Sequence, residues 1–214
     1  AAGGTWSSAY GVVSVGSGTG EVTGNTISSD EVSYTVTNIY GCAGVATKAI
    51  RVEGAPGYIY SFCGKGVDSY TGDGGQSYLA TIRNLRDLVT DKDGNIYISD
   101  ITSNVVRRSA SNGIISTIAG NGGTGNGGDG GAATDATLNE PSGLYVDEGG
   151  NIFISNTGSN TIRKVNATTG IITTIAGVAG VYGLTGDGGP ASAAKLYQPL
   201  GLCGDASGDL YISD

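Results

Sequence analysis

The stretch Asn95-Ile-Tyr-Ile-Ser-Asp100 decides the fold, because it recurs as Asn151-Ile-Phe-Ile-Ser-Asn156 and again as Asp209-Leu-Tyr-Ile-Ser-Asp214. The copies lie 56 residues (151 − 95) and 58 residues (209 − 151) apart. A second phrase, Gly-Asp-Gly-Gly, keeps the same period and stands at residues 72–75, 128–131 and 186–189. A fixed period of this size is typical of an array of repeated supersecondary units.

One period, residues 143–177, divides into four short apolar stretches separated by turns rich in Gly, Asn and Thr. Glycine supplies positive φ and Asn tolerates it, so these breaks suit β-hairpins. Four antiparallel strands per repeat form a blade of a β-propeller. Ile152 and Ile154 point to one face of the second stretch and Phe153 to the other, so both faces are apolar. This pattern predicts a sheet that lies between neighbouring blades.

The stretch from residue 143 to 177 resembles the NHL repeat, and the resemblance extends over about residues 57–214. Residues 185–202 are similar to the long linker of the bacterial NHL subtype. The resemblance implies an all-β array of about two and a half propeller blades, assigned to residues 58–214. The first copy departs from the pattern at 76–79 and at 86–87, which predicts that its blade holds its linker differently.

Residues 1–53 differ in character, with alternating strands rich in Ser, Thr, Val and Gly. They resemble a partial bacterial Ig-like domain of group 2, which implies a β-sandwich, and residues 54–57 read as the linker to the blades. Period-two alternation assigns seven side chains to the sandwich core. They are Trp6, Val13, Val15, Val22, Val32, Tyr34 and Val36.

The sequence opens at the tryptophan strand of the Ig-like pattern and ends on the second strand of a third blade. A closed propeller needs about four or more blades, and open sheet edges pair with other strands. We therefore expect either further blades in a longer chain or neighbouring copies that complete the Ig sheet and the blade ring. Head-to-tail completion of the second kind leads to a filament.

Composition excludes several functions. The formal net charge of −8 and pI near 4.4 disfavour nucleic acid as a partner. No apolar run of about 18 residues suggests a membrane span in this segment. Histidine is absent, which removes the commonest general base and metal ligand and excludes the zinc-dependent lyase chemistry of some NHL-like propellers for these blades. We therefore expect no enzyme activity and no catalytic residue.

Three cysteines, Cys42, Cys63 and Cys203, allow one internal disulfide at most. A Cys42–Cys63 bond is one interpretation. The favoured alternative treats Cys63 and Cys203 as small buried apolar side chains on strands.

The Gly-Asp-Gly-Gly loops offer weak calcium candidates at Asp73, Asp129 and Asp187. One carboxylate per loop is far short of the six to eight oxygens that calcium takes, so the favoured interpretation has each Asp accepting backbone N–H bonds. The stretch 91–95 resembles the opening of a calcium loop, but Thr102 stands where a glutamate is needed, which favours a hairpin turn.

Further repeated polar positions invite a functional interpretation. Asp100, Asn156 and Asp214 end equivalent strands, and their repetition favours turn stabilisation over a metal site. The basic pairs on the third strands are expected to bond acids on adjacent strands. These pairs are Arg107–Arg108 and Arg163–Lys164.

Taken together, the residues favour an extracellular structural or adhesive protein at a bacterial cell surface, whose partners are copies of itself or other parts of a longer chain. The alternative is a propeller that binds a ligand, either a glycan or a surface protein. A third interpretation is a metal-dependent lactonase-like or lyase-like enzyme whose catalytic residues lie in blades outside this segment. No cofactor is expected beyond the calcium candidates, and Asn166 in Asn-Ala-Thr is a candidate glycosylation site on a hairpin turn.

Overall fold

The computed structural model describes residues 5–8, 13–15, 22–24, 29–37, 43–51, 63–64 and 69–214. Contacts divide the chain into two units, Ala1–Phe62 and Cys63–Asp214. The predicted linker at 54–57 lies outside the described residues, and before residue 52 only the backbone of the strands is described.

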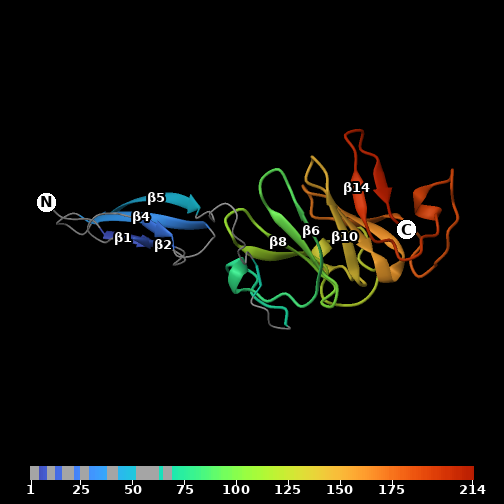
Figure 1. The fold of residues 1–214 in the computed structure, drawn as a ribbon, viewed down its shortest axis with the longest axis horizontal. Coiled ribbons are helices and arrows are strands. Elements are labelled where there is room, and N and C mark those ends of the chain that lie inside the picture. Colours follow the sequence, from blue (N-terminus) through green and yellow to red (C-terminus); the bar gives the residue numbers. More distant parts are fainter. Residues whose placement is uncertain are drawn as a thin grey trace, which may run out of the picture. The chain divides into compact units, whose positions relative to one another are not determined.

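The first unit contains two antiparallel sheets (Figure 1). One sheet has the order β1-β4-β5, and the other pairs β2 with β3. The strands are β1 (Thr5–Ser8), β2 (Val13–Val15), β3 (Val22–Gly24), β4 (Ser29–Thr37) and β5 (Ala43–Arg51). Side chains of the predicted sandwich core lie outside the description, so the Ig-like module stays a prediction.

The second unit contains three sheets whose strands follow one another in chain order. Two sheets have four antiparallel strands and one has two, in agreement with the predicted two and a half blades (Figure 1). The first blade is β6 (Leu85–Thr90), β7 (Ile96–Asp100), β8 (Val105–Ser109) and β9 (Ile115–Ala119). The second is β10 (Pro141–Val146), β11 (Ile152–Asn156), β12 (Thr161–Val165) and β13 (Ile172–Ala176). The third is β14 (Leu202–Gly204) and β15 (Leu210–Ile212).

Short 3-10 helices lie in the connections between these strands. Three of them occupy equivalent places in the linkers that precede the three blades, and η3 lies in the β11–β12 turn. They are η1 (Ser77–Leu79), η2 (Ala133–Asp135), η3 (Thr157–Ser159) and η4 (Ala191–Ala193).

The linker before each complete blade reaches the outermost strand of that same blade. Gly130 N donates to Ile172 O at 2.9 Å, and Ile172 N donates to Gly131 O at 3.1 Å. The first blade repeats both bonds, between Ile115 and the loop at 74–75. The prediction that the first linker is held differently is therefore wrong. Backbone atoms of the Gly-Asp-Gly-Gly loop make these bonds, so they are insensitive to the side chains that differ at 76–79.

A glycine with positive φ lets each linker fold against itself. Gly128 has φ +94°, and a Cβ placed on it would lie 2.7 Å from the Cα atom of Ala136. The same approach recurs between Gly72 and Ala80 at 2.8 Å and between Gly186 and Ala194 at 2.7 Å. The recurrence of Gly in the repeat therefore has a steric cause.

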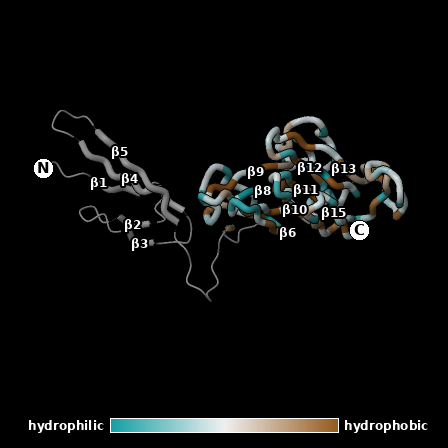
Figure 2. The backbone as a smooth tube through the Cα atoms, turned by 90° about the horizontal axis from the view of Figure 1, so that it is seen from above, coloured by the Kyte–Doolittle hydropathy of each residue, from teal (hydrophilic) through white to brown (hydrophobic). Residues whose placement is uncertain are grey.

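The main core lies between the first and second blades. Ile152 and Ile154 are buried and Phe153 is half-buried, so both faces of β11 are covered as predicted. The core also receives Leu138 from the second linker and Tyr97 from β7. Figure 2 shows hydrophobic stretches alternating with hydrophilic turns along the second unit.

Candidate functional site

The calcium candidates Asp73 and Asp129 each face a buried arginine. Asp73 Oδ1 lies 2.5 Å from Arg107 Nη2, and Asp129 Oδ1 lies 2.7 Å from Arg163 Nη2. Both arginine side chains have 0% exposure, whereas the aspartates are 44% and 47% exposed. Arg107 also donates to the carbonyls of Thr71 and Thr81, on the two arms of its linker. Each arginine therefore fastens a linker loop to its blade.

The sequence predicted that the basic residues of the third strands bond acids on adjacent strands. For Arg107 and Arg163 this prediction is wrong, because their acidic partners lie in the linkers. The favoured interpretation of the aspartates is confirmed in part, since Asp73 Oδ2 accepts Thr117 N–H at 2.9 Å and Asp129 Oδ2 accepts Thr174 N–H at 3.0 Å. Burial alone would raise the pKa of the Asp73 carboxyl, but hydrogen bonds from Thr117 and Arg107 outweigh it and hold the pKa below its usual value.

The third candidate, Asp187, is exposed and pairs with no cation among the described residues. Within the described part of the chain, no group of three or more His, Cys, Asp or Glu side chains is placed to hold a metal ion. Both carboxylate oxygens of Asp73 and Asp129 are already engaged by N–H groups. Calcium at any of the three loops stays a prediction.

Asp100, Asn156 and Asp214, which stand at equivalent strand ends, each bind the C-terminal end of the linker that precedes their blade. Asp100 accepts backbone N–H bonds from Arg83, Asn84 and Ser103, and the other two positions likewise accept linker N–H bonds. The predicted role in turn stabilisation is therefore confirmed for Asp100, through Ser103, whereas the printed contacts of Asn156 and Asp214 are with the linkers.

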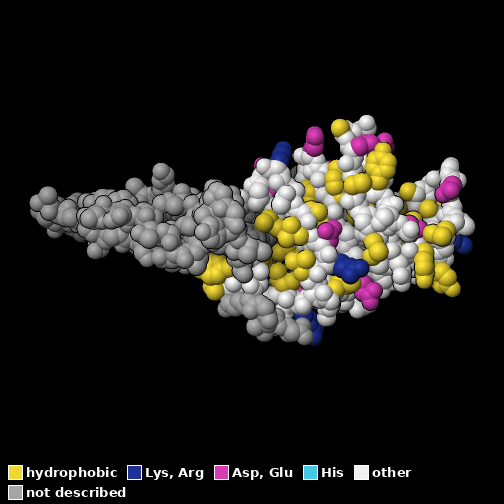
Figure 3. Space-filling model, in the orientation of Figure 1, with side chains coloured by type: hydrophobic (Ala, Val, Ile, Leu, Met, Phe, Trp, Pro, Cys, Tyr) yellow, Lys and Arg dark blue, Asp and Glu magenta, His cyan; other side chains and the backbone are white. Residues whose placement is uncertain are grey.

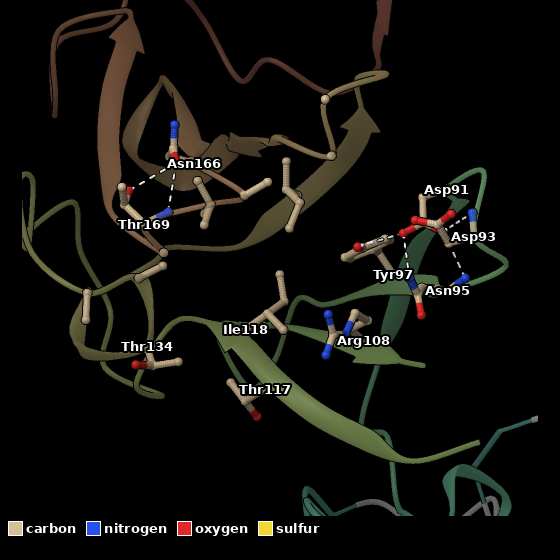
Figure 4. A pocket seen from close by; sticks show the side chains of 18 residues that line it. Asp91, Asp93, Asn95, Tyr97, Arg108, Thr117, Ile118, Thr134, Asn166 and Thr169 are labelled. Atoms are coloured by element: carbon tan, nitrogen blue, oxygen red, sulfur yellow. Dashed lines mark hydrogen bonds between the residues drawn. The ribbon is translucent and has the colours of Figure 1, made fainter. Parts of the chain in front are cut away.

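A cavity of about 540 Å³ lies between the first two blades (Figure 4). The first blade contributes the β6–β7 turn and parts of β7, β8 and β9. The second linker contributes residues 132–134, and the second blade contributes its β10–β11 and β12–β13 turns. Its size falls within the range of about 300–1,000 Å³ usual for small-molecule sites. Sequence reasoning missed this site, because its lining comes from six separate segments, 91–97, 108, 117–118, 132–134, 149–152 and 165–170.

One wall of the cavity is a fixed polar turn. Asp91 Oδ1 accepts the backbone N–H groups of Asp93 and Asn95, and Asp91 Oδ2 accepts the Tyr97 hydroxyl at 3.0 Å. This confirms the predicted hairpin turn at 91–95. Burial raises the pKa of the Tyr97 hydroxyl, and its hydrogen bond to Asp91 raises it further. Tyr97 therefore stays a neutral donor that holds the wall in shape.

Arg108 and Asp93 are two charged groups that line this cavity, and Arg108 also interacts electrostatically with the Tyr97 hydroxyl. Arg108 is half-buried on β8, and Figure 4 shows it between the polar turn and Ile118. Neither residue belongs to an ion pair within the described residues, and Arg108 Nε finds no hydrogen-bond partner among them. Lys164 occupies the same place in the second blade but lies over the Phe153 ring, 5.2 Å from its centre. This difference between copies is the one sequence signal that points to the cavity.

The opposite wall carries hydroxyl and amide groups. Thr134 from η2, together with Asn166 and Thr169 from the β12–β13 turn, lines this side, and all three are exposed (Figure 4). The Asn166 Oδ1 atom accepts bonds from the N–H groups of Thr168 and Thr169, so its side chain is held in place. The predicted glycosylation residue is thus exposed, and its modification stays a prediction.

The cysteines differ from the expectation of buried apolar side chains. Cys63 and Cys203 are free thiols, Cys63 half-buried and Cys203 exposed on β14. The prediction of burial is wrong for Cys203, because Tyr145 of β10 lies against its neighbour Gly204 and no further sheet among the described residues covers Cys203 itself. Cys42 lies outside the described residues.

Comparison with known proteins identifies the architecture. A family model described as Teneurin NHL domain matches residues 121–183. A Bacteroides thetaiotaomicron VPI-5482 protein of unknown function superposes with a TM-score of 0.57 and 19% identity, over 86% of this chain and 42% of its own. The second unit therefore has the architecture of a β-propeller segment, within which residues 121–183 are similar to an NHL domain.

An auxiliary nutrient binding protein from the same Bacteroides strain shares the fold, with a TM-score of 0.50 and 12% identity over 90% of this chain and 42% of its own. The chain therefore spans less than half the length of either of these two structures. A search among curated proteins gives no match. In the described residues, no helix has the length and apolar character needed to cross a membrane.

Proposed function

We propose that this chain is a ligand-binding segment of an NHL-type propeller, and that the cavity between its first two blades takes a neutral saccharide. The observation that carries the proposal is the half-buried Arg108, which faces this cavity without an ion-pair partner among the described residues. A half-buried guanidinium gains from charge-assisted hydrogen bonds, and a ligand in the cavity supplies the acceptors.

The lining favours hydroxyl groups over other ligand chemistry. Arg108 donates and the Asp93 carboxylate accepts, while Thr134 does both, which matches the paired donor and acceptor character of neighbouring sugar hydroxyls. Ile118 and Ile152 offer apolar surface for the C–H faces of a sugar ring. A net charge of −8 opposes the approach of an acidic ligand, so the neutral class is favoured.

The comparisons support binding in a limited way. One protein that shares the fold is named an auxiliary nutrient binding protein, so ligand binding accords with this architecture. The proposal includes an extracellular location at a bacterial surface, which is compatible with the likeness to that nutrient binding protein. The proposed activity is binding, without catalysis or a cofactor.

The test is calorimetric titration of the chain with neutral oligosaccharides identified on a glycan array. Arg108→Met should weaken binding at least about tenfold, since a hydrogen bond to a charged group contributes about 1.5–3 kcal/mol. Lys164→Met removes the equivalent cation of the second blade, outside the cavity lining, and should leave affinity unchanged. Equal loss in both variants, or tighter binding of acidic sugars, would contradict the proposal.

The extracellular structural or adhesive role expected from the sequence is kept as a second candidate. Sedimentation of the chain at increasing concentration tests the second role, and a single monomeric species throughout would count against a filament.

A further inference from the structure

The turn between β12 and β13 is one residue longer than the equivalent turn between β8 and β9. In the first blade Gly113 N donates to Ala110 O at 2.7 Å, a bond that spans three residues (113 − 110). In the second blade Gly170 N donates to Asn166 O at 2.9 Å, a bond that spans four residues (170 − 166). Residues 110–113 are called the short turn below, and residues 166–170 the long turn.

The hairpin itself does not need the extra residue. Val165 pairs with Ile172 beside the long turn, just as Ser109 pairs with Ile115 beside the short turn. Each turn also ends on a glycine whose carbonyl accepts a hydrogen bond from the 3-10 helix of its own linker. The short turn therefore suffices to join the two strands and to hold the linker. The extra residue of the long turn calls for a cause outside the hairpin.

Hydrogen bonds fix the shape of the long turn. Asn166 Oδ1 accepts the backbone N–H groups of Thr168 and Thr169 at 3.0 and 2.9 Å. Asn151 Oδ1 accepts the Ala167 N–H at 3.1 Å, which ties the long turn to the β10–β11 turn. The first blade has an alanine in place of Asn166, so its turn lacks this cap. The long turn is therefore a wall with a defined surface.

One side of the long turn faces the cavity between the first two blades. Thr169 and Asn166 belong to the cavity lining, whereas Thr168 does not. Figure 4 shows Thr169 across the cavity from Arg108. The Thr169 hydroxyl donates to Asn166 Oδ1 at 3.1 Å and accepts the Ile171 N–H at 3.3 Å. A hydroxyl oxygen has two lone pairs, so Thr169 keeps one acceptor position for a ligand.

The cavity has room for more than one sugar ring. Its volume of about 540 Å³ lies in the range of sites for drug-sized ligands, and two linked rings form a ligand of that size. Ile118 offers apolar surface between the two walls (Figure 4). Figure 3 shows charged side chains of both signs scattered among uncharged ones on one face of the second unit, which accords with a neutral ligand.

We propose that the long turn is the specificity loop of this site and that the ligand is a neutral disaccharide or a longer oligosaccharide. One ring lies at Arg108 and Asp93, and the next ring donates a hydroxyl to Thr169. This inference rests on the saccharide binding proposed above and names its ligand more closely. A single ring at Arg108 gains nothing from the long turn, so the affinity ratio between a disaccharide and its monosaccharide reports on the turn alone.

The first experiment measures that ratio by calorimetric titration with maltose, cellobiose and lactose, with glucose measured by displacement of the bound disaccharide. Thr169→Val should weaken disaccharide binding about fivefold, the change expected for one lost hydrogen bond between neutral groups, and should leave glucose binding unchanged. Thr168→Val is the matched control, because Thr168 stands in the same turn outside the cavity lining, and it should alter neither affinity. An equal effect of both substitutions would overturn the proposal.

The second experiment exchanges the turns. Residues 166–170 are replaced by the Ala-Ser-Asn-Gly of the short turn, which closes the same register in the first blade. This variant should keep the circular dichroism spectrum of the parent and lose most of the preference for the disaccharide. The long turn placed at 110–113, outside the cavity lining, is the control and should keep the preference.

The outcomes separate this inference from the function on which it rests. An unchanged disaccharide preference in the short-turn variant, together with binding that still depends on Arg108, would overturn the specificity loop and leave the saccharide site standing. A parent chain that binds neither glucose nor any disaccharide would overturn both. Should the short-turn variant fail to fold, the comparison of Thr169→Val with Thr168→Val decides the matter.

Discussion

Two of the loop aspartates can be compared directly, because Asp129 has an arginine partner and Asp187 has none among the described residues. We expect Asp129→Asn to destabilise the chain and Asp187→Asn to leave its stability within about 0.5 kcal/mol, the usual range for surface substitutions. Both residues stand in Gly-Asp-Gly-Gly loops with the same backbone turn, so the pair isolates the ionic contact.

The magnitude for Asp129→Asn follows from the geometry. Removing one partner of a fully buried ion pair costs about 3–5 kcal/mol, whereas an exposed pair contributes about 0–1 kcal/mol. Arg163 is fully buried but Asp129 is 47% exposed, and Arg163 keeps its bonds to the Gly127 and Thr137 carbonyls. An asparagine still accepts the Thr174 N–H. We therefore expect a loss of about 1.5 kcal/mol, which lowers the melting temperature by about 3–6 °C in a unit of this size.

Urea unfolding followed by far-ultraviolet circular dichroism measures the difference, with the denaturant slope compared between variants to exclude a change in the unfolded state. Equal free energies of unfolding for Asp129→Asn and Asp187→Asn would refute the reasoning. That result would mean that water stabilises the buried Arg163 guanidinium as well as the Asp129 carboxylate does. A loss above 4 kcal/mol for Asp129→Asn would also contradict it, since the exposed carboxylate could not account for it.

Further predictions concern backbone, charge and thiol chemistry. Gly128→Ala should lower the free energy of unfolding in urea by several kcal/mol, because the added Cβ would clash with the backbone of Ala136. Gly130→Ala should lower it by only about 1–2 kcal/mol, because a Cβ there meets nothing within 4 Å and adds only the strain of positive φ. Hydrogen bonds hold the pKa of Asp73 below its usual value, so its contribution to the free energy of unfolding should be fully present above about pH 4 and be lost as the pH falls further. The free energy of unfolding of Asp73→Asn should lack this acid-dependent loss. Cys203, which is exposed, should react with iodoacetamide faster than Cys63, whose pKa is raised by burial; mass spectrometry of timed digests would show the reverse order if the exposures were wrong.

The repeat made the blades predictable from sequence. Each strand phrase has its own turn residues, and register is set by which face is apolar, so period and alternation together gave four strands per blade. The Asp91 turn and the contact between Asp100 and Ser103 were predictable for the same reason, since these partners lie within a few residues. The bonds from the strand-end residues to the linkers span 16 or 17 residues and had no local signal.

The arginine pairs and the cavity were harder to predict because their contacts are distant in sequence. Arg107 and Asp73 are separated by 34 residues, and nothing local indicates that the linker returns to the outer strand of its own blade. Expecting a cation to pair across adjacent strands was reasonable for an exposed sheet. It failed because the third strands are buried by the linkers, so the acid had to come from the linker itself.

In a repeat protein, residues that recur hold the blades together, and residues that break the repeat are free to bind something else. The Asp–Arg pair recurs and fastens each linker. Arg108 becomes Lys164 in the next copy, and Asn126 becomes Leu184. The first change leaves a cation in a cavity, and the second leaves an exposed leucine in the third linker. Binding specificity in this chain should therefore change when these departures are swapped between copies, while stability should change when the recurring residues are altered.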